Sequence, residues 1–258
     1  MKLTASKIKQ LLDSLYAEYN IFSSSSDPNW DLRRFKSKSD IELAAFIVSC
    51  YSYGNVASIN SFTESIFNYT GKNLTNFINA SDFSVPHRDT NFYYRFNSNT
   101  DFFLLLSAIK SALNQYGSLK NVFLEGYSET QENIIPALNH FSEKLRSFVK
   151  PTKSFEYLIP PVTRNSTCKR LNLFLRWMVR KDNIDFGFWG REVSPSKLIV
   201  PVDTHVYKVA QKLGLINRKS CDMKFAVGLT NKLKLFDPED PVKYDFALCH
   251  LGIDKKNF

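Results

Sequence analysis

The chain has 258 residues, and its 43% hydrophobic content is enough for one large or two small domains with a substantial core. Its formal net charge of +9 favours a polyanionic partner, most commonly nucleic acid, although an AT-rich genome would also explain much of the lysine content. Four scattered cysteines and the lack of a long apolar run argue against iron–sulfur or structural zinc sites and against a membrane helix, so we expect a cytoplasmic protein.

Apolar residues recur at helical spacing through most of the chain, and few segments alternate as a strand would. We therefore predict an all-α protein with roughly eight to ten helices. The aromatic-rich segment 85–96 is expected to be irregular. The predicted helices span residues 6–19, 40–52, 57–69, 100–116, 133–148, 169–180, 204–213, 222–235 and 242–251, the last with Gly252 as its stop.

Lys169 stands at the start of the predicted helix 169–180, after the possible caps 165–167. A lysine on a helix is usually a solvated surface charge. In the first turn, however, the helix field disfavours a cation, and a neutral amine is a nucleophile toward a sugar C1′ or a carbonyl. Both interpretations remain open on this residue alone.

Asp203 lies in the sequence Pro-Val-Asp-Thr-His, directly before the predicted helix 204–213. It is either an ordinary helix N-cap or a carboxylate held ionised by helix N–H groups, which could stabilise an oxocarbenium-like transition state. His205 has no second histidine at i+4, so we predict no metal site.

These two segments carry a resemblance to a known superfamily. PVDTHV (201–206), followed by a capped helix, resembles the aspartate motif of the helix-hairpin-helix DNA glycosylases, and Lys169 matches the Schiff-base lysine of their bifunctional members. The separation of the two residues, 203 − 169 = 34, is longer than in most members because of the extra loop 181–196. Such a gap is similar to the archaeal 8-oxoguanine DNA glycosylase (AGOG) branch. A related bacterial family shares CKRLNLFLRWMVR, D-x-G-x-W, PVDTHV and DP-V-KYDFAL.

The resemblance implies a two-lobed helix-hairpin-helix glycosylase fold with a cleft between the lobes. Residues 36–197 would form a helical barrel domain that ends in the hairpin and the lysine helix. Residues 1–35 and 198–258 would form a second lobe carrying Asp203. The hairpin 160–167 lacks the glycines usual in the superfamily, so Arg164, Asn165 and Ser166 are expected to make its phosphate contacts.

The implied activity is excision of 8-oxoguanine from double-stranded DNA by a monomer, followed by strand cleavage. The damaged nucleotide would be rotated out of the duplex. Asp203 would stabilise the sugar cation, and Lys169 would attack C1′ to form a Schiff base that undergoes β-elimination. No cofactor is required by this chemistry.

Further residues are assigned by helical spacing and by the resemblance. Leu173 and Arg176 share the helical face of Lys169, and Arg176 either hydrogen-bonds a purine or pairs with an acid elsewhere. Asp245 resembles an acid that reads the purine edge, or is only a first-turn acid. Tyr51 lies where the superfamily places a base- or duplex-contacting side chain. The basic residues expected to neutralise phosphates are Arg164, Lys169, Arg170, Lys197, Lys208 and Lys212.

Two alternatives stay open. One is a non-catalytic nucleic-acid-binding protein of the same fold, which the glycine-free hairpin favours. The other is a glycosylase for another damaged base. A metal-dependent hydrolase is disfavoured because the sequence contains no cluster of ligands.

Overall fold

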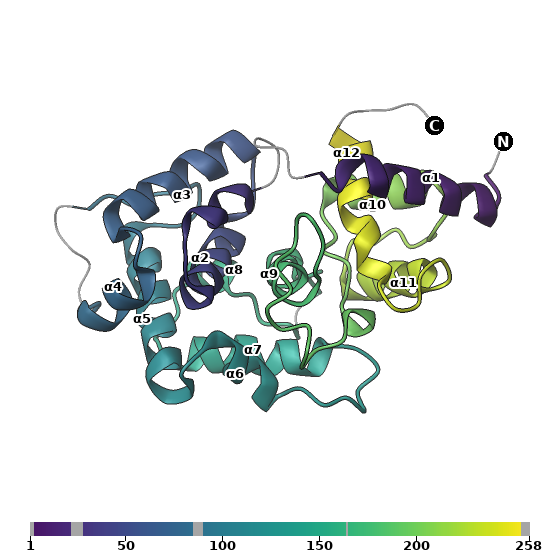
Figure 1. Cartoon of the computed structure of the whole chain (residues 1–258). Helices are drawn as coiled ribbons and strands as arrows, with labels where there is room; N and C mark the ends of the chain where they lie inside the picture. Colours follow the sequence, from purple (N-terminus) through teal and green to yellow (C-terminus); the bar gives the residue numbers. More distant parts are fainter. Residues whose placement is uncertain (1–2, 22–27, 85–89, 164, 254–258) are drawn as a thin grey trace. The chain divides into compact units, whose positions relative to one another are not determined.

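The computed structural model describes residues 3–21, 28–84, 90–163 and 165–253. Within these ranges the chain is all-α, as predicted, with two isolated β-bridges and no strand (Figure 1). Three of the described α-helices were not predicted, because each is too short to show a helical period: α4 (Leu74–Ala80), α6 (Leu119–Glu125) and α8 (Phe155–Leu158). None of the helices in the described ranges has the length and apolar character needed to cross a bilayer.

Contacts divide the chain into two compact units. Unit 1 comprises residues 1–23, 132–134 and 165–258, and unit 2 comprises residues 24–131 and 135–164. This division differs from the predicted one, which placed residues 165–197 in the domain that does not carry Asp203. The lysine helix lies in the unit of Asp203 because buried polar contacts join it to the C-terminal segments.

Unit 2 is built around one buried helix. In α2 (Lys38–Tyr51) every residue from Asp40 onward is buried. Its two buried acids stabilise the beginnings of other helices: Asp40 Oδ1 accepts hydrogen bonds from Thr75 of α4 (N 2.8 Å, Oγ1 2.7 Å), and Glu42 Oε2 accepts one from Leu119 N of α6 (3.1 Å). The other described helices of this unit are η1 (Trp30–Arg34), α3 (Val56–Thr70), α5 (Asn99–Tyr116), α7 (Ile135–Ser147) and α8.

The caps of unit 2 explain where its predicted helices begin and end. Ser37 caps α2, and Ser98 forms a capping box with Asp101 at the start of α5. Gly117 ends α5 in the left-handed conformation, with φ of 76°. The predicted helices 40–52, 57–69, 100–116 and 133–148 are thus confirmed within about two residues at each end.

Unit 1 contains the two helices on which the functional prediction depends. They are α9 (Lys169–Val179) and α10 (Thr204–Lys212). Figure 1 shows α10 beside α12 and α12 beside α1, in agreement with their contacts. The remaining helices of this unit are α1 (Ala5–Tyr19), η2 (Pro195–Lys197), α11 (Met223–Lys234), η3 (Pro241–Tyr244) and α12 (Asp245–Ile253).

Gly252 does not end the last helix, contrary to the prediction. It lies inside α12, where a Cβ atom would meet His205 Cβ at 2.7 Å and His205 Cα at 3.2 Å. The glycine therefore permits close packing of α12 on the start of α10. It serves the contact between two helices and not a turn.

Candidate functional site

Lys169 is the first residue of α9 and is half-buried. The residue before it, Cys168, is the N-cap and has left-handed backbone angles (φ 48°, ψ 39°), an uncommon conformation for a residue with a side chain. Ser166 Oγ accepts a hydrogen bond from Cys168 N at 3.1 Å and supports this turn. The first-turn position predicted for Lys169 is confirmed, whereas none of the predicted caps 165–167 is the N-cap itself.

A buried hydrogen bond ties the start of α9 to the start of α10. Thr167 Oγ1 donates to Val202 O at 2.9 Å, and Asn172 Nδ2 donates to Thr167 O at 2.9 Å. Thr167 precedes Lys169 by two residues, and Val202 directly precedes Asp203. The backbone beside the lysine is therefore fixed to the backbone beside the aspartate.

Asp203 uses its two carboxylate oxygens differently. Oδ1 caps α10 by accepting hydrogen bonds from His205 N (2.8 Å) and Val206 N (2.9 Å), so the predicted capping role is confirmed. Oδ2 lies 3.9 Å from Cys249 Sγ of α12, which donates to it. One oxygen thus holds the helix while the other faces α12.

Asp245, the first residue of α12, is buried and lies within electrostatic reach of both Lys169 and Asp203. Burial raises the pKa of Asp245 to about 6; the Arg176 and Lys169 cations oppose this rise, and the Asp203 carboxylate adds to it. Arg176 Nη1 donates to Asp245 Oδ2 at 2.6 Å, and Asp245 Oδ1 has no hydrogen-bond partner among the residues that the structure describes. The amine and the carboxylate singled out from the sequence therefore act on one buried acid.

Arg176 belongs to a buried ion cluster. Its Nε donates to Asp185 Oδ1 at 3.2 Å, and Asp185 also pairs with Arg180. Arg180 is further paired with Asp182 (3.0 Å) and Asp240 (2.7 Å). Of the two interpretations of Arg176, pairing with acids is the one observed, and its side chain is only 3% exposed.

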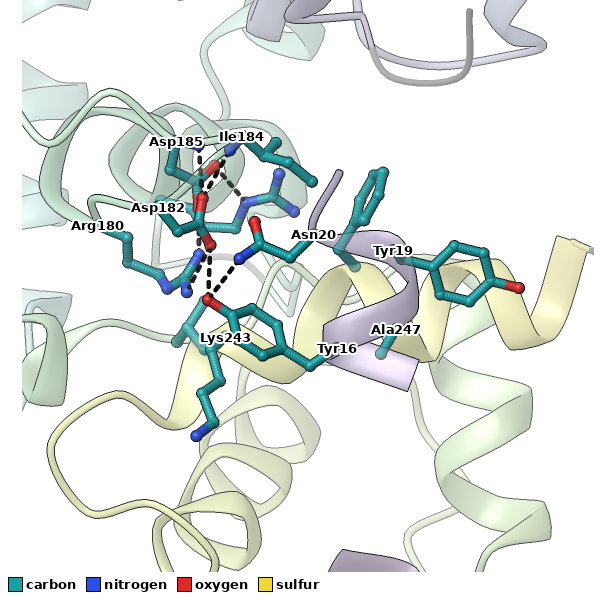
Figure 2. Close-up of a pocket in the computed structure, with 12 residues that line it drawn as sticks. Tyr16, Tyr19, Asn20, Arg180, Asp182, Ile184, Asp185, Lys243 and Ala247 are labelled. Carbon is teal, nitrogen blue, oxygen red and sulfur yellow. Dashed lines mark hydrogen bonds and ion pairs between the residues drawn. The ribbon is translucent and has the colours of Figure 1, made fainter. Parts of the chain in front are cut away.

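Figure 2 shows a small pocket of unit 1 beside this cluster. Asp182 accepts hydrogen bonds there from Tyr16 Oη (3.2 Å) and from the backbone N–H groups of Ile184 and Asp185 (2.8 Å each). The internal volume of the pocket, about 10 Å³, accommodates about one water molecule and no nucleobase. The pocket is thus too small to be the site of an extruded base.

The other residues predicted for base recognition are buried. Leu173 is 5% exposed, and Tyr51 is fully buried in unit 2, where its ring packs against Phe62 and Tyr94 at centroid distances of 4.7 and 6.0 Å. In this arrangement Tyr51 offers no surface to a base. Leu173 is buried as well, but it lies one turn after Lys169 on the same face of α9.

The residues predicted to bind phosphate differ in exposure. Asn165, Lys208 and Lys212 are exposed, while Ser166, Lys169 and Lys197 are half-buried. Arg170 is buried, 9% exposed, so it is a poorer phosphate ligand than predicted. Arg164 lies outside the described residues.

The sequence interpretation missed the residues that organise the site, chiefly Thr167, Asn172, Asp185 and Arg180. The D-x-G-x-W motif (185–189) was their one visible signal, and in the structure it is a turn with Gly187 at a φ of 70° and Trp189 buried. The loop after α9 folds back on it: Phe186 N donates to Trp177 O (2.9 Å) and Trp189 N donates to Met178 O (2.7 Å). The last carbonyls of α9 are satisfied in this way, and Asp185 is brought beside both arginines.

Among the described residues, no group of three His, Cys, Asp or Glu side chains is arranged to hold a metal ion. The model of one protein family, described as "Protein of unknown function (DUF2400)", matches residues 27–254 of the chain. No curated protein and no solved structure matches the chain.

Proposed function

The chain belongs to the DUF2400 family, and from the site itself we propose that it is a bifunctional DNA glycosylase and apurinic-site lyase that excises an oxidised purine, 8-oxoguanine. The proposal includes the two-lobed helix-hairpin-helix glycosylase fold, with the extruded nucleotide held in a cleft. One observation carries it: Lys169 and Asp203 begin two helices whose starts are joined by the Thr167–Val202 hydrogen bond, and both act on Asp245.

The chemistry assigned to the pair balances without a cofactor. The ionised Asp203 carboxylate stabilises the oxocarbenium character of the sugar as the bond from C1′ to the base breaks, and the base leaves as an anion that takes a proton from water. Lys169 Nζ then forms a bond to C1′, and Asp203 accepts the proton that the amine loses and passes it to O4′ as the sugar ring opens. The ring-opened Schiff base loses the C2′ proton, and the 3′ phosphate leaves as the strand is cut.

Asp245 supports a purine as the substrate. Its Oδ1 is buried and has no hydrogen-bond partner within the described part of the chain, while Arg176 donates a hydrogen bond to the other oxygen. Such an acceptor is costly unless a ligand donates to it. An N–H group on the edge of the extruded base would supply that donor.

The test is borohydride trapping on a duplex that contains 8-oxoguanine. We expect a covalent adduct with the unaltered protein, none with Lys169→Gln, and an adduct with Lys208→Gln, whose lysine is exposed on α10. Asp203→Asn should retain the cap, since Asn and Asp are equivalent N-caps, yet slow excision by about a hundredfold or more.

Two outcomes would replace this proposal. An adduct that survives Lys169→Gln excludes the assigned nucleophile. Equal affinity for damaged and undamaged duplex with no adduct on any lesion of a panel would identify a non-catalytic DNA-binding protein. An adduct only with an alkylated or ring-opened purine would keep the chemistry and change the substrate.

A further inference from the structure

A group of aromatic side chains lies exposed on unit 2, and the residues of the proposed reaction belong to unit 1. Phe96 is 60% exposed, Tyr93 is 64% exposed and Tyr157 is 41% exposed. Phe96 and Arg95 occupy the tip of a tight turn, residues 94–97. We call Tyr53, Arg95, Phe96 and Tyr157 the ring patch.

The turn has a fixed geometry. Tyr94 N donates to Asn97 O at 2.8 Å, and Asn97 N donates to Tyr94 O at 2.9 Å. Arg95 at its tip has φ of 55°, in the left-handed region that is uncommon for a residue with a side chain. Glycine would adopt this conformation at no steric cost, so the arginine side chain is held there against a backbone preference.

Hydrogen bonds from neighbouring segments hold the turn in place. Tyr53 Oη donates to Tyr94 O (3.0 Å) and to Asn97 Oδ1 (2.6 Å), while Tyr94 Oη donates to Tyr53 O (2.6 Å). Asn97 Nδ2 donates to Ser154 O at 2.7 Å and brings segment 150–157 beside the turn. The exposed rings therefore stand on a rigid support.

The ring patch combines aromatic faces with a cation. The rings of Tyr53 and Phe96 are nearly parallel (5°) with centroids 6.2 Å apart, and Tyr157 meets Phe96 edge-on at 5.5 Å. Arg95 Cζ lies 5.7 Å from the Phe96 centroid and 5.9 Å from that of Tyr53. Gly54 leaves room for this guanidinium, because a Cβ there would meet Arg95 Nη1 at 2.6 Å.

We propose that the ring patch binds unpaired nucleobases of single-stranded nucleic acid by stacking. Exposed rings beside a planar guanidinium offer the π-faces and the cation on which successive bases stack. The exposed charged residues of segments 93–97 and 150–157 are Arg95, Lys150 and Lys153, which complement phosphate. This charge favours a nucleic acid over an apolar peptide, and the site goes beyond the proposed lyase chemistry and is independent of it.

The experiment measures fluorescence anisotropy of two labelled probes, an oligothymidine and a strand of equal length made of tetrahydrofuran abasic analogues, which lack the C1′ hydroxyl needed for a Schiff base. We expect Phe96→Ala with Tyr157→Ala to weaken oligothymidine binding about tenfold or more and to leave the abasic strand unaffected. Arg95→Lys keeps the charge and should weaken only the oligothymidine. Leu235→Ala, which removes another exposed apolar side chain, is the matched control and should change neither.

An equal loss on both probes, or no loss, would overturn the inference. Both replaced rings are exposed, and thermal unfolding monitored by circular dichroism verifies that the variants fold. The ring-patch variants should still give the borohydride adduct at saturating duplex, so failure of one proposal is distinguishable from failure of the other.

Discussion

At the scale of single residues, the site depends on how charge is buried around Asp245. Arg176 of α9 and Arg180 at its C-cap pair with a group of carboxylates. The centre of this group has almost no access to solvent, since the side chains of Arg176, Asp185 and Asp245 are each at most 5% exposed. Buried ion pairs contribute little net stability when complete, but removal of one partner leaves an uncompensated charge. The arginine that was a candidate base reader is therefore first a partner of Asp245.

This arrangement predicts a pH-dependent effect of Arg176→Met. Burial raises the pKa of Asp245 from 3.8 to about 6 in the folded protein, so the folded state holds its proton more tightly than the unfolded chain. The contribution of Asp245 to the unfolding free energy is fully present below about pH 4 and is lost as the pH rises through about 6. Without Arg176 this pKa rises further. Urea unfolding should show a loss of about 3–5 kcal/mol at pH 8 and a smaller loss at pH 5.

The matched control is the double variant Arg176→Met with Asp245→Leu, which leaves no lone charge at that position. It should recover most of the stability lost at pH 8, while Asp185 keeps its pairing with Arg180. A loss of equal size at both pH values would show that packing, and not the charge of Asp245, sets the effect.

At the scale of elements, the helices with long apolar periods were predictable and the contacts between them were not. Asp203 and Asp222 were expected to begin helices and do so, because an N-cap is a local signal. Gly252 was assigned to a helix end by the same local rule. Its role is set by His205, which is distant along the chain and whose contact no local pattern reveals.

The structure predicts opposite effects for alanine at two helical glycines. Gly252→Ala would place Cβ against His205 Cβ and its backbone, and we expect a loss of about 1–3 kcal/mol in unfolding free energy. Gly228→Ala in α11 would meet only Ile216 Cδ1, the movable end of a side chain. It should be neutral or stabilising by about 0.5–1 kcal/mol, because alanine is the better helix former. Destabilisation of equal size at both sites, in denaturant titrations, would contradict the close packing of α12 on α10.

At the scale of the whole molecule, the sequence indicated the helical class and allowed one or two domains, and the compact units of the structure divide the chain elsewhere than the resemblance implied. The resemblance assigned α9 to one domain. The bonds that place it in the other unit involve Thr167, Asp185 and Asp245, none of which had a pairing that sequence could reveal. The positions of Lys169 and Asp203 at the starts of two helices were predictable, because each helix start carries a local signal in the sequence.

The charge of the chain predicts a salt-dependent affinity for DNA. With a net charge of +9, the logarithm of the association constant should fall linearly with the logarithm of salt concentration. Lys208→Gln should lower the magnitude of this slope by about 0.9, the value for one lost phosphate contact. Lys72→Gln, at an exposed lysine of unit 2, serves as the control and should leave the slope unaltered. Equal slopes for both variants would exclude Lys208 from the DNA interface.

Because of the Thr167 hydroxyl, the separation of Lys169 and Asp203 in space does not depend on their separation in the sequence. Because this hydroxyl anchors the chain beside Lys169 directly to the chain beside Asp203, the 34-residue stretch between the amine and the acid does not determine how far apart they lie in space. That connection can gain or lose residues without moving the two groups of the proposed reaction. The condition is that the Thr167–Val202 hydrogen bond and the contacts of the loop with the end of α9 are kept. A lengthened loop in this position is thus a tolerated insertion on a fixed frame, and the spacing of the two residues in sequence is no guide to their competence.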